Sequence, residues 1–185
     1  MSRILLTGAA GHTASVLLPR LLEHPDRPEI IAFDLLPATM RHPRLHWRQG
    51  DLRAVDWQPI LAGVDSVIHL AFVVLSPRLG RQRHWRAEMA EINREGSGRL
   101  LQAASSVGVE RFVYSSSVAV YGAWPDNPEG ISEDQPLRPP PGFAYAEDKT
   151  SVEALMQEYS LRHPELRLSR LRLHAIVGQH AQPLV

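Results

Sequence analysis

The sequence contains no cysteine, a single lysine, few aromatic residues and no long apolar run. The absence of cysteine excludes a disulfide framework and a thiolate metal site. The nine histidines show no HExxH or similar spacing of ligands, so we expect no metal centre. The longest apolar stretch, near Val67–Leu75, is interrupted by His69 and is too short to span a membrane.

Charge of neither sign is in excess, because 20 basic residues balance 20 acidic ones. Nothing therefore favours a nucleic-acid partner or an anionic membrane surface. The apolar start, Ile4-Leu5-Leu6, ends at Thr7-Gly8 and is too short for the core of a secretory signal. We expect a soluble, cytoplasmic chain whose 185 residues form one domain.

The one lysine, Lys149, lies four residues after Tyr145, in a chain that uses arginine at 19 other positions. Arginine is a rigid planar fork, whereas lysine is a compact, rotatable ammonium. On a helix, side chains four residues apart face the same side. A nearby cation lowers the pKa of a phenol, which suits the phenol to acid–base chemistry. An exposed polar pair would show the same spacing, so the other motifs must decide.

Short apolar runs alternate with longer helical patterns, which is typical of a parallel sheet covered on both faces. We therefore predict an α/β fold of the Rossmann type, a doubly wound parallel sheet in three layers, α/β/α. The expected strands are Arg3–Thr7, Glu29–Asp34, Arg44–Arg48, Ser66–Leu70, Arg111–Ser115 and Leu166–Leu173. The expected helices are Gly11–Glu23, Arg81–Val107 and Phe143–Arg162, with a helical turn near Val55–Ala62.

Two segments have distinctive patterns. The helix at 81–107 carries one apolar stripe, which predicts a core-facing side or, alternatively, a subunit contact. Residues 122–142 are rich in proline and glycine, and a loop of this length is usually functional or mobile. No linker divides the chain, so residues 1–185 are expected to be a single domain. The stripe consists of Trp85, Met89, Ile92, Gly96 and Leu100.

A glycine-rich turn follows the first expected strand. Gly8 and Gly11, with Ala14 in the third position, match a dinucleotide-binding turn, in which glycine lets the backbone approach a pyrophosphate. Asp34 ends the second strand, where a carboxylate accepts hydrogen bonds from an adenosine ribose. The same carboxylate would repel the 2′-phosphate of NADP. The sequence therefore predicts NAD, unless Arg41 folds back to offset that charge.

In this order, the motifs resemble those of the extended short-chain dehydrogenase/reductases, specifically the NAD-dependent epimerase/dehydratase family. The resemblance runs from Arg3 to about Gly178, and the full ordered set is far more specific than any one motif. The motifs are Thr7-Gly8-Ala9-Ala10-Gly11, Asp34, Gly50-Asp51-Leu52, Ile68-His69-Leu70-Ala71, Asn93-Arg94-Glu95-Gly96-Ser97, Ser115-Ser116-Ser117, Val120-Tyr121-Gly122 and Tyr145-Ala146-Glu147-Asp148-Lys149.

This resemblance implies a role for each matching position. Ser117, Tyr145 and Lys149 would be the catalytic serine, tyrosine and lysine, and Lys149 would also hold the nicotinamide ribose. Asp34 would bind the adenosine ribose. The other implied cofactor-binding residues are Gly8, Gly11, His12 and Thr13 along the pyrophosphate, Asp51 and Leu52 beside the adenine, and Leu70, Ala71, Asn93 and Ser115 along the cleft.

Three departures from the family pattern limit what it implies. The family often has Leu-Arg-Pro followed by Phe-Asn where this chain reads Leu171-Arg172-Leu173-His174-Ala175, so a substrate-facing asparagine is absent. Val118-Ala119 replaces the Asp-Glu pair of sugar-nucleotide dehydratases, which disfavours dehydration by that route. Members usually continue into a small C-terminal domain, so we expect a fragment that lacks most of the substrate-binding part.

The leading hypothesis is an NAD-dependent oxidoreductase or epimerase that acts on a hydroxyl or carbonyl of a small molecule, such as a sugar derivative. An epimerase, a dehydrogenase of sugars or uronic acids, and a carbonyl or steroid-type reductase using NADP all stay open. The competing hypotheses are a dinucleotide-sensing regulator without turnover and an inactive truncated piece of an enzyme. The resemblance also implies a homodimer formed through the helices at 81–107 and 143–162.

Overall fold

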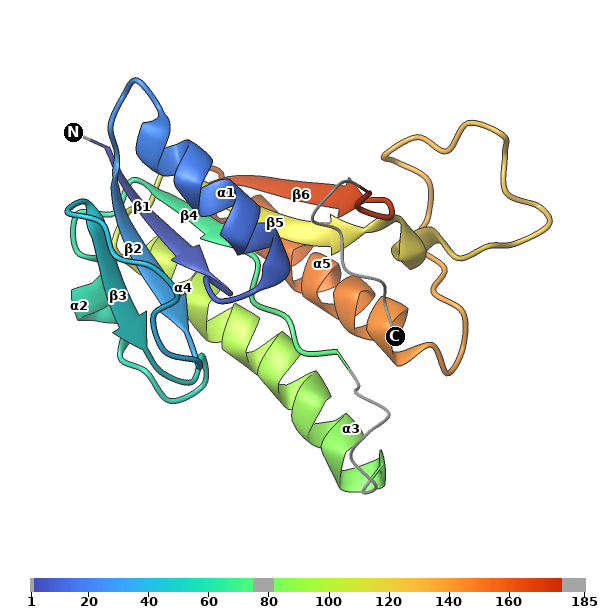
Figure 1. Cartoon of the computed structure of the whole chain (residues 1–185). Coiled ribbons are helices and arrows are strands. Elements are labelled where there is room, and N and C mark those ends of the chain that lie inside the picture. The colour runs from blue at the N-terminus through green and yellow to red at the C-terminus, as the bar shows by residue number, and fades with distance from the viewer. Residues whose placement is uncertain (1, 75–81, 178–185) are drawn as a thin grey trace.

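The structure is a computed structural model that describes residues 2–74 and 82–177, with only the backbone of residues 82–85. Its described strands form one parallel sheet in the order β3-β2-β1-β4-β5-β6 (Figure 1). This confirms the predicted sheet, including the third strand, whose only large apolar residues are Leu45 and Trp47. The strands are β1 (Arg3–Thr7), β2 (Glu29–Asp34), β3 (Leu45–Gln49), β4 (Ser66–His69), β5 (Arg111–Ser117) and β6 (Arg167–Leu173).

Helices cover both faces of the sheet, which confirms the predicted three layers (Figure 1). Within β1, Leu6 packs with α1 on one face, while Leu5 packs with α4 and α5 on the other. Adjacent strand residues point to opposite faces, so an unbroken apolar run serves both layers. The helices are α1 (His12–Glu23), α2 (Trp57–Leu61), α3 (Gln82–Glu91), α4 (Ser97–Ser106) and α5 (Ala144–Arg162).

The strand order reverses at β1, which pairs with β2 on one side and with β4 on the other. In open α/β sheets, ligands bind beyond the carboxyl ends of the strands at such a reversal. Thr7, Asp34 and His69 end the three strands concerned, and Ser117 ends β5. The topology thus brings the predicted motifs to one edge of the sheet.

The predicted helix 81–107 is interrupted by a π-helical turn, η1 (Ile92–Gly96), between α3 and α4. The prediction of one uninterrupted α-helix over residues 81–107 was therefore wrong. Arg81 lies outside the described residues. A Cβ on Gly96 would lie 2.8 Å from the Cβ of Leu52, so only glycine allows this close approach. π-Helical turns are frequent at functional sites, and this one carries Asn93.

The segment 122–142 contains no helix or strand, as predicted. It follows a short 3-10 helix, η2 (Val118–Tyr121), and leads into α5. Arg138 organises the segment, since its guanidinium bonds Asp126 at 2.8 Å and its carbonyl accepts a bond from the Trp124 indole at 2.7 Å. The segment is thus a loop held by its own side chains.

Candidate functional site

The turn after β1 brings its backbone very close to the chain that leaves β4. Gly8 has a φ of +72°, and a Cβ there would lie 2.6 Å from the amide nitrogen of Ala71. Such a contact excludes every other residue at this position. Gly11 then caps the N-terminus of α1, whose first residues are His12 and Thr13. Free amide groups and the helix dipole favour an anion at this end.

Asp34 lies opposite this turn. Its carboxylate accepts hydrogen bonds from the backbone amides of Ala10, at 3.0 Å, and Leu36, at 2.9 Å. These bonds hold the carboxylate at the mouth of a cleft of about 280 Å³. The neighbouring side chains of Leu35 and Leu36 are 65% and 58% exposed. No cation follows Asp34 directly in the sequence.

The cleft unites most of the predicted cofactor-binding residues. Its walls come from the glycine turn, the end of β2, the segment after β3 and the chain that leaves β4. Ile92, beside Asn93, also lines it. The predicted cofactor-binding residues that do not line it are His12, Thr13, Asn93, Ser115, Tyr145 and Lys149. Phe72 and Val73 also line it and were not singled out in the sequence. The predicted residues found in its walls are Gly8, Gly11, Asp34, Asp51, Leu52, Leu70 and Ala71.

Asp51 makes its main contact with Arg53. The Arg53 guanidinium bonds both carboxylate oxygens of Asp51, the shorter distance being 2.7 Å. Hydrogen bonds from this guanidinium keep the pKa of Asp51 below its usual value, against the smaller effect of burial. The carboxylate of Asp51 is therefore charged at the cleft wall, and Arg53 already occupies part of its hydrogen-bonding capacity.

A chain of buried hydrogen bonds runs beneath the cleft from β1 to η1. Ser97 donates to the carbonyl of Asn93 at 2.5 Å, so it accepts from Nε2 of His69 at 2.8 Å. Nδ1 of His69 then accepts from the Thr7 hydroxyl at 2.6 Å, and Thr7 in turn accepts from the amide of Ala71 at 3.4 Å. Burial lowers the pKa of His69 to about 3, with a further effect of the Lys149 charge. His69 is thus neutral and protonated on Nε2.

Asn93 joins the cleft to α5. Its amide oxygen accepts from the backbone of Val73 at 2.8 Å, and its nitrogen donates to the Val73 carbonyl at 3.0 Å. The same nitrogen donates to Asp148 at 3.1 Å. Val73 lines the cleft and Asp148 precedes the predicted catalytic lysine. Asn93 therefore fixes the cleft wall relative to the helix that carries Tyr145 and Lys149.

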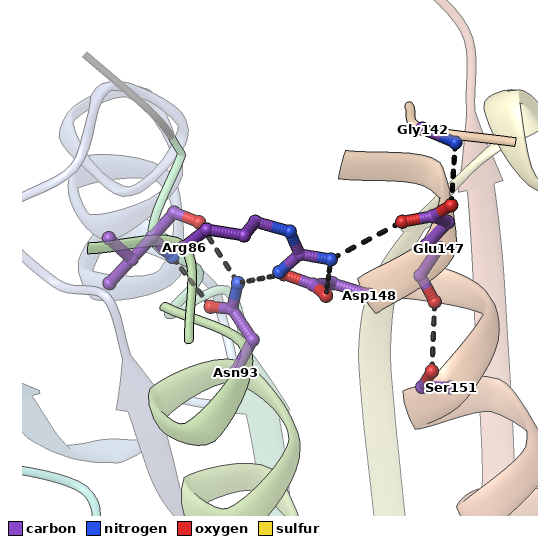
Figure 2. A network of polar contacts seen from close by, with 7 residues as sticks. Arg86, Asn93, Gly142, Glu147, Asp148 and Ser151 are labelled. Carbon is purple, nitrogen blue, oxygen red and sulfur yellow. Dashed lines mark hydrogen bonds and ion pairs between the residues drawn. The ribbon is translucent and has the colours of Figure 1, made fainter. Parts of the chain in front are cut away.

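Arg86 completes this network from α3, as Figure 2 shows. Its guanidinium bonds the buried carboxylate of Asp148 at 2.8 Å and reaches Glu147 at 3.4 Å. Neither Arg86 nor Asp148 was a sequence candidate, because 62 residues separate them. The ion pair connects α3 to the first turns of α5.

Lys149 is buried among aromatic rings, with 3% of its surface exposed. Its Nζ lies 3.8 Å from the ring centre of Phe72, 4.7 Å from that of Tyr114 and 5.8 Å from that of Tyr145. Among the described residues it donates to the carbonyl of Ser115, at 2.6 Å. An ammonium has three donors, so two are left for a ligand. Burial lowers the pKa of Lys149 to about 7, partly offset by the charge of Glu153.

Tyr145 lies close to this lysine, and Ser117 comes two residues after Ser115, whose carbonyl accepts the Lys149 hydrogen bond. The Tyr145 ring packs edge-on against Phe72, with 5.4 Å between ring centres, and also contacts Phe143. Ser117 ends β5, and its Oγ accepts a bond from the amide of Ala119 at 3.2 Å, so its proton is free to donate. Phe72 touches Lys149 and Tyr145 and also lines the cleft. Through Phe72, Lys149 and Tyr145 therefore border the cleft.

A second group of buried polar residues was missed in the sequence. Glu153, on α5, accepts hydrogen bonds from Ser116 and from Arg172 of β6. Arg172 also bonds the hydroxyl of Tyr121 and, at 2.7 Å, the carbonyl of Glu133. The position of Glu153, one helical turn after Lys149, was the signal that could have revealed this group.

Within the described ranges, no three histidine, aspartate or glutamate side chains cluster as metal ligands would. Nor does any helix in those ranges combine the length and apolar character that crossing a membrane requires.

Residues 4–184 match the model of the NAD dependent epimerase/dehydratase family, and the chain belongs to this family. It is 29% identical to a dTDP-glucose 4,6-dehydratase of Streptomyces griseus, over 91% of this chain and 53% of the relative. It is 30% identical to a UDP-glucose 4-epimerase of Streptococcus mutans, over 95% of this chain and 52% of the relative. The chain thus spans about half the length of these relatives.

Solved structures show the same likeness. The structure of MoeE5 in complex with UDP-glucuronic acid and NAD superimposes with a TM-score of 0.82 at 29% identity. The match covers 100% of this chain and 58% of that one. The described fold is therefore that of the family, confirming the fold predicted from the sequence.

Proposed function

We propose that this chain is the NAD-binding and catalytic part of an oxidoreductase or epimerase that acts on a hydroxyl or carbonyl of a sugar nucleotide. One observation carries the proposal. Phe72 forms part of the cleft wall and at the same time contacts both Lys149 and Tyr145. A cofactor in this cleft would therefore end beside a phenol and an ammonium, which is where a redox reaction at a carbinol carbon needs a proton relay.

The residues present suit NAD. Gly8 and Gly11 give a pyrophosphate access to backbone amides, Asp34 offers acceptors to the adenosine ribose, and Lys149 has two donors to spare for the other ribose. When bound, NAD would supply the acceptor and donor of the hydride. The protein would contribute binding, orientation and proton transfer.

Each catalytic side chain has a distinct role. Tyr145 exchanges a proton with the oxygen on the reacting carbon, and the ammonium of Lys149 favours its phenolate form. Ser117 donates a hydrogen bond to the same oxygen, which orients the substrate and stabilises the charge that develops there. Val118 and Ala119 follow Ser117 in place of the Asp-Glu pair of sugar-nucleotide dehydratases, which disfavours elimination of water by that route.

The substrate class is supported by the relatives, which are named for dTDP-glucose and UDP-glucose. Turnover should be assayed with a panel of sugar nucleotides, free sugars and ketones, in the protein that contains this chain. We expect turnover of at least one sugar nucleotide and less with the unlinked sugars. NAD binding without turnover of any compound in the panel would favour the dinucleotide-sensing regulator instead.

Asp34 is expected to make the protein prefer NAD over NADP. The 2′-phosphate of NADP would approach this carboxylate, and the residues that follow it, Leu35 and Leu36, are apolar. Titrating both cofactors against the intrinsic tryptophan fluorescence measures the preference. Asp34→Asn should reduce it, because the amide removes the repulsion. Tighter binding of NADP by the unaltered protein would contradict the assignment.

We also propose a homodimer formed through the helices at 81–107 and 143–162. A shallow groove lies between α4 and α5, with Gly98, Leu155 and Tyr159 among its lining residues. Leu161, on α5, is 76% exposed. Leu161→Glu should yield monomers by light scattering, whereas Ile131→Glu, in the loop, should not. A dimer unaffected by Leu161→Glu would argue against this surface.

A further inference from the structure

Glu153 is an acid enclosed in the core, with 1% of its surface exposed. Arg172 binds it through two nitrogens, at 2.7 Å from Nη2 and 3.1 Å from Nε, and Ser116 donates a further bond. A buried ion pair of this kind adds little stability compared with apolar residues of the same size. Its presence beside the proposed catalytic residues therefore suggests a role other than stability.

Lys149 and Glu153 contact consecutive residues of β5. Lys149 donates to the carbonyl of Ser115 at 2.6 Å, and Glu153 accepts from the hydroxyl of Ser116. The two side chains lie one helical turn apart on the same side of α5. Together they fix the register between α5 and β5. The next residue of the strand is Ser117, so the same contacts set its position relative to Lys149.

The charge of Lys149 depends on few neighbours. From β4, His69 is neutral, and from β5, Tyr114 is uncharged because burial raises its pKa well above the usual value. On α5 itself, the Tyr145 ring centre lies 5.8 Å from the Lys149 Nζ, and Asp148 is bound to Arg86 of α3. Glu153 is then the neighbouring anion that favours the ammonium.

Arg172, on β6, opposes this effect. Hydrogen bonds and charge from Glu153 raise the pKa of Arg172, which is cationic at every relevant pH. Its positive charge compensates part of the negative charge that Lys149 experiences. Removing Glu153 and removing Arg172 should therefore change the protonation of Lys149 in opposite directions.

We propose that Glu153, with Arg172 as its counter-ion, is a positioning residue that sets the protonation of Lys149 and the place of Ser117. This inference rests on the catalytic roles proposed above for Lys149 and Ser117. Because Arg172 also binds Tyr121 and the carbonyl of Glu133, the loop at 122–142 is attached to the same ion pair. The pair thus links the loop to the charge of the active-site lysine.

The single lysine of the chain allows a direct test. In protein labelled with carbon-13 lysine, the Lys149 side-chain signal is identified as the one missing from Lys149→Arg, and its chemical shift against pH reports the pKa of Lys149 without any need for turnover. Glu153→Gln should lower this pKa by about one unit or more, because it removes an opposite charge in a buried setting. Arg172→Gln should raise it. Glu158→Gln, an exposed position on α5 paired with Arg162, should leave it unchanged.

Shifts of opposite sign in the pKa of Lys149 distinguish this role from a structural one. A structural role would change that pKa in the same direction in both variants, or in neither. Equal pKa values in all variants, or shifts of the same sign for Glu153→Gln and Arg172→Gln, would overturn the proposal. If Glu153→Gln does not fold, Arg172→Gln decides alone, and an unchanged or lowered pKa contradicts it. Absence of turnover in the unaltered protein would reject the catalytic assignment while leaving the titration result standing.

Discussion

Replacing Tyr145 with phenylalanine should lower turnover by at least the roughly 10²–10⁴-fold that loss of acid–base catalysis typically costs. The substitution removes the transferable proton and keeps the ring, which packs against Phe72 with 5.4 Å between centres. NAD binding should stay nearly intact, since the phenol is not needed to hold the cleft. Steady-state kinetics and tryptophan fluorescence, measured on the same preparation, separate the two effects.

Tyr159→Phe provides the matched control for this experiment. Tyr159 lies on the same helix, where it stacks on His163 and lies away from the cleft. The Tyr159→Phe variant should therefore lose little activity. Full activity in Tyr145→Phe would show that the proton relay has been assigned to the wrong residue, and the sensor hypothesis would then be the better account.

Replacing Lys149 with arginine should impair both turnover and NAD binding, even though it keeps a positive charge. The ammonium fits between three aromatic rings and the carbonyl of Ser115, and 3% of the residue is exposed. A guanidinium is larger, planar and unable to rotate its donors in the same way. Kinetics and cofactor titration of this variant measure the two losses.

Of the 20 lysine and arginine positions in the chain, 19 are arginine. This substitution therefore also tests why one lysine is present. Circular dichroism should show that the variant is folded, to exclude simple overpacking of the core. A folded Lys149→Arg variant with normal activity would mean that the ammonium has no special role and that the solitary lysine has no functional meaning.

The sheet could be predicted from the sequence because its signals are local. Apolar runs such as Ile4-Leu5-Leu6 predict strands buried on both faces, and the glycine turn marks the boundary of strand and helix. The third strand had the weakest signal, because its apolar content is only Leu45 and Trp47. The order of the strands within the sheet was not predicted and comes from the structure.

The contacts around the catalytic residues could not be predicted, because they join distant parts of the chain. Arg86 and Asp148 are 62 positions apart, and Glu153 and Arg172 are 19 apart. In the sequence, Asp148 and Glu153 resemble the charges of a solvated helix face, and only packing reveals that they are buried. The close approach of Gly96 to Leu52, within the π-helical turn at 92–96, likewise joins distant parts of the chain, and no local pattern indicates it.

The most direct test of the account is whether NAD reaches Lys149. In protein labelled with carbon-13 lysine, NAD should shift the Lys149 signal in a saturable way, with the same dissociation constant as the change in tryptophan fluorescence. That agreement would place the cofactor beside the proposed proton relay. A fluorescence change that saturates while the lysine signal stays constant would mean that NAD binds away from Lys149, and it would contradict the proposed site.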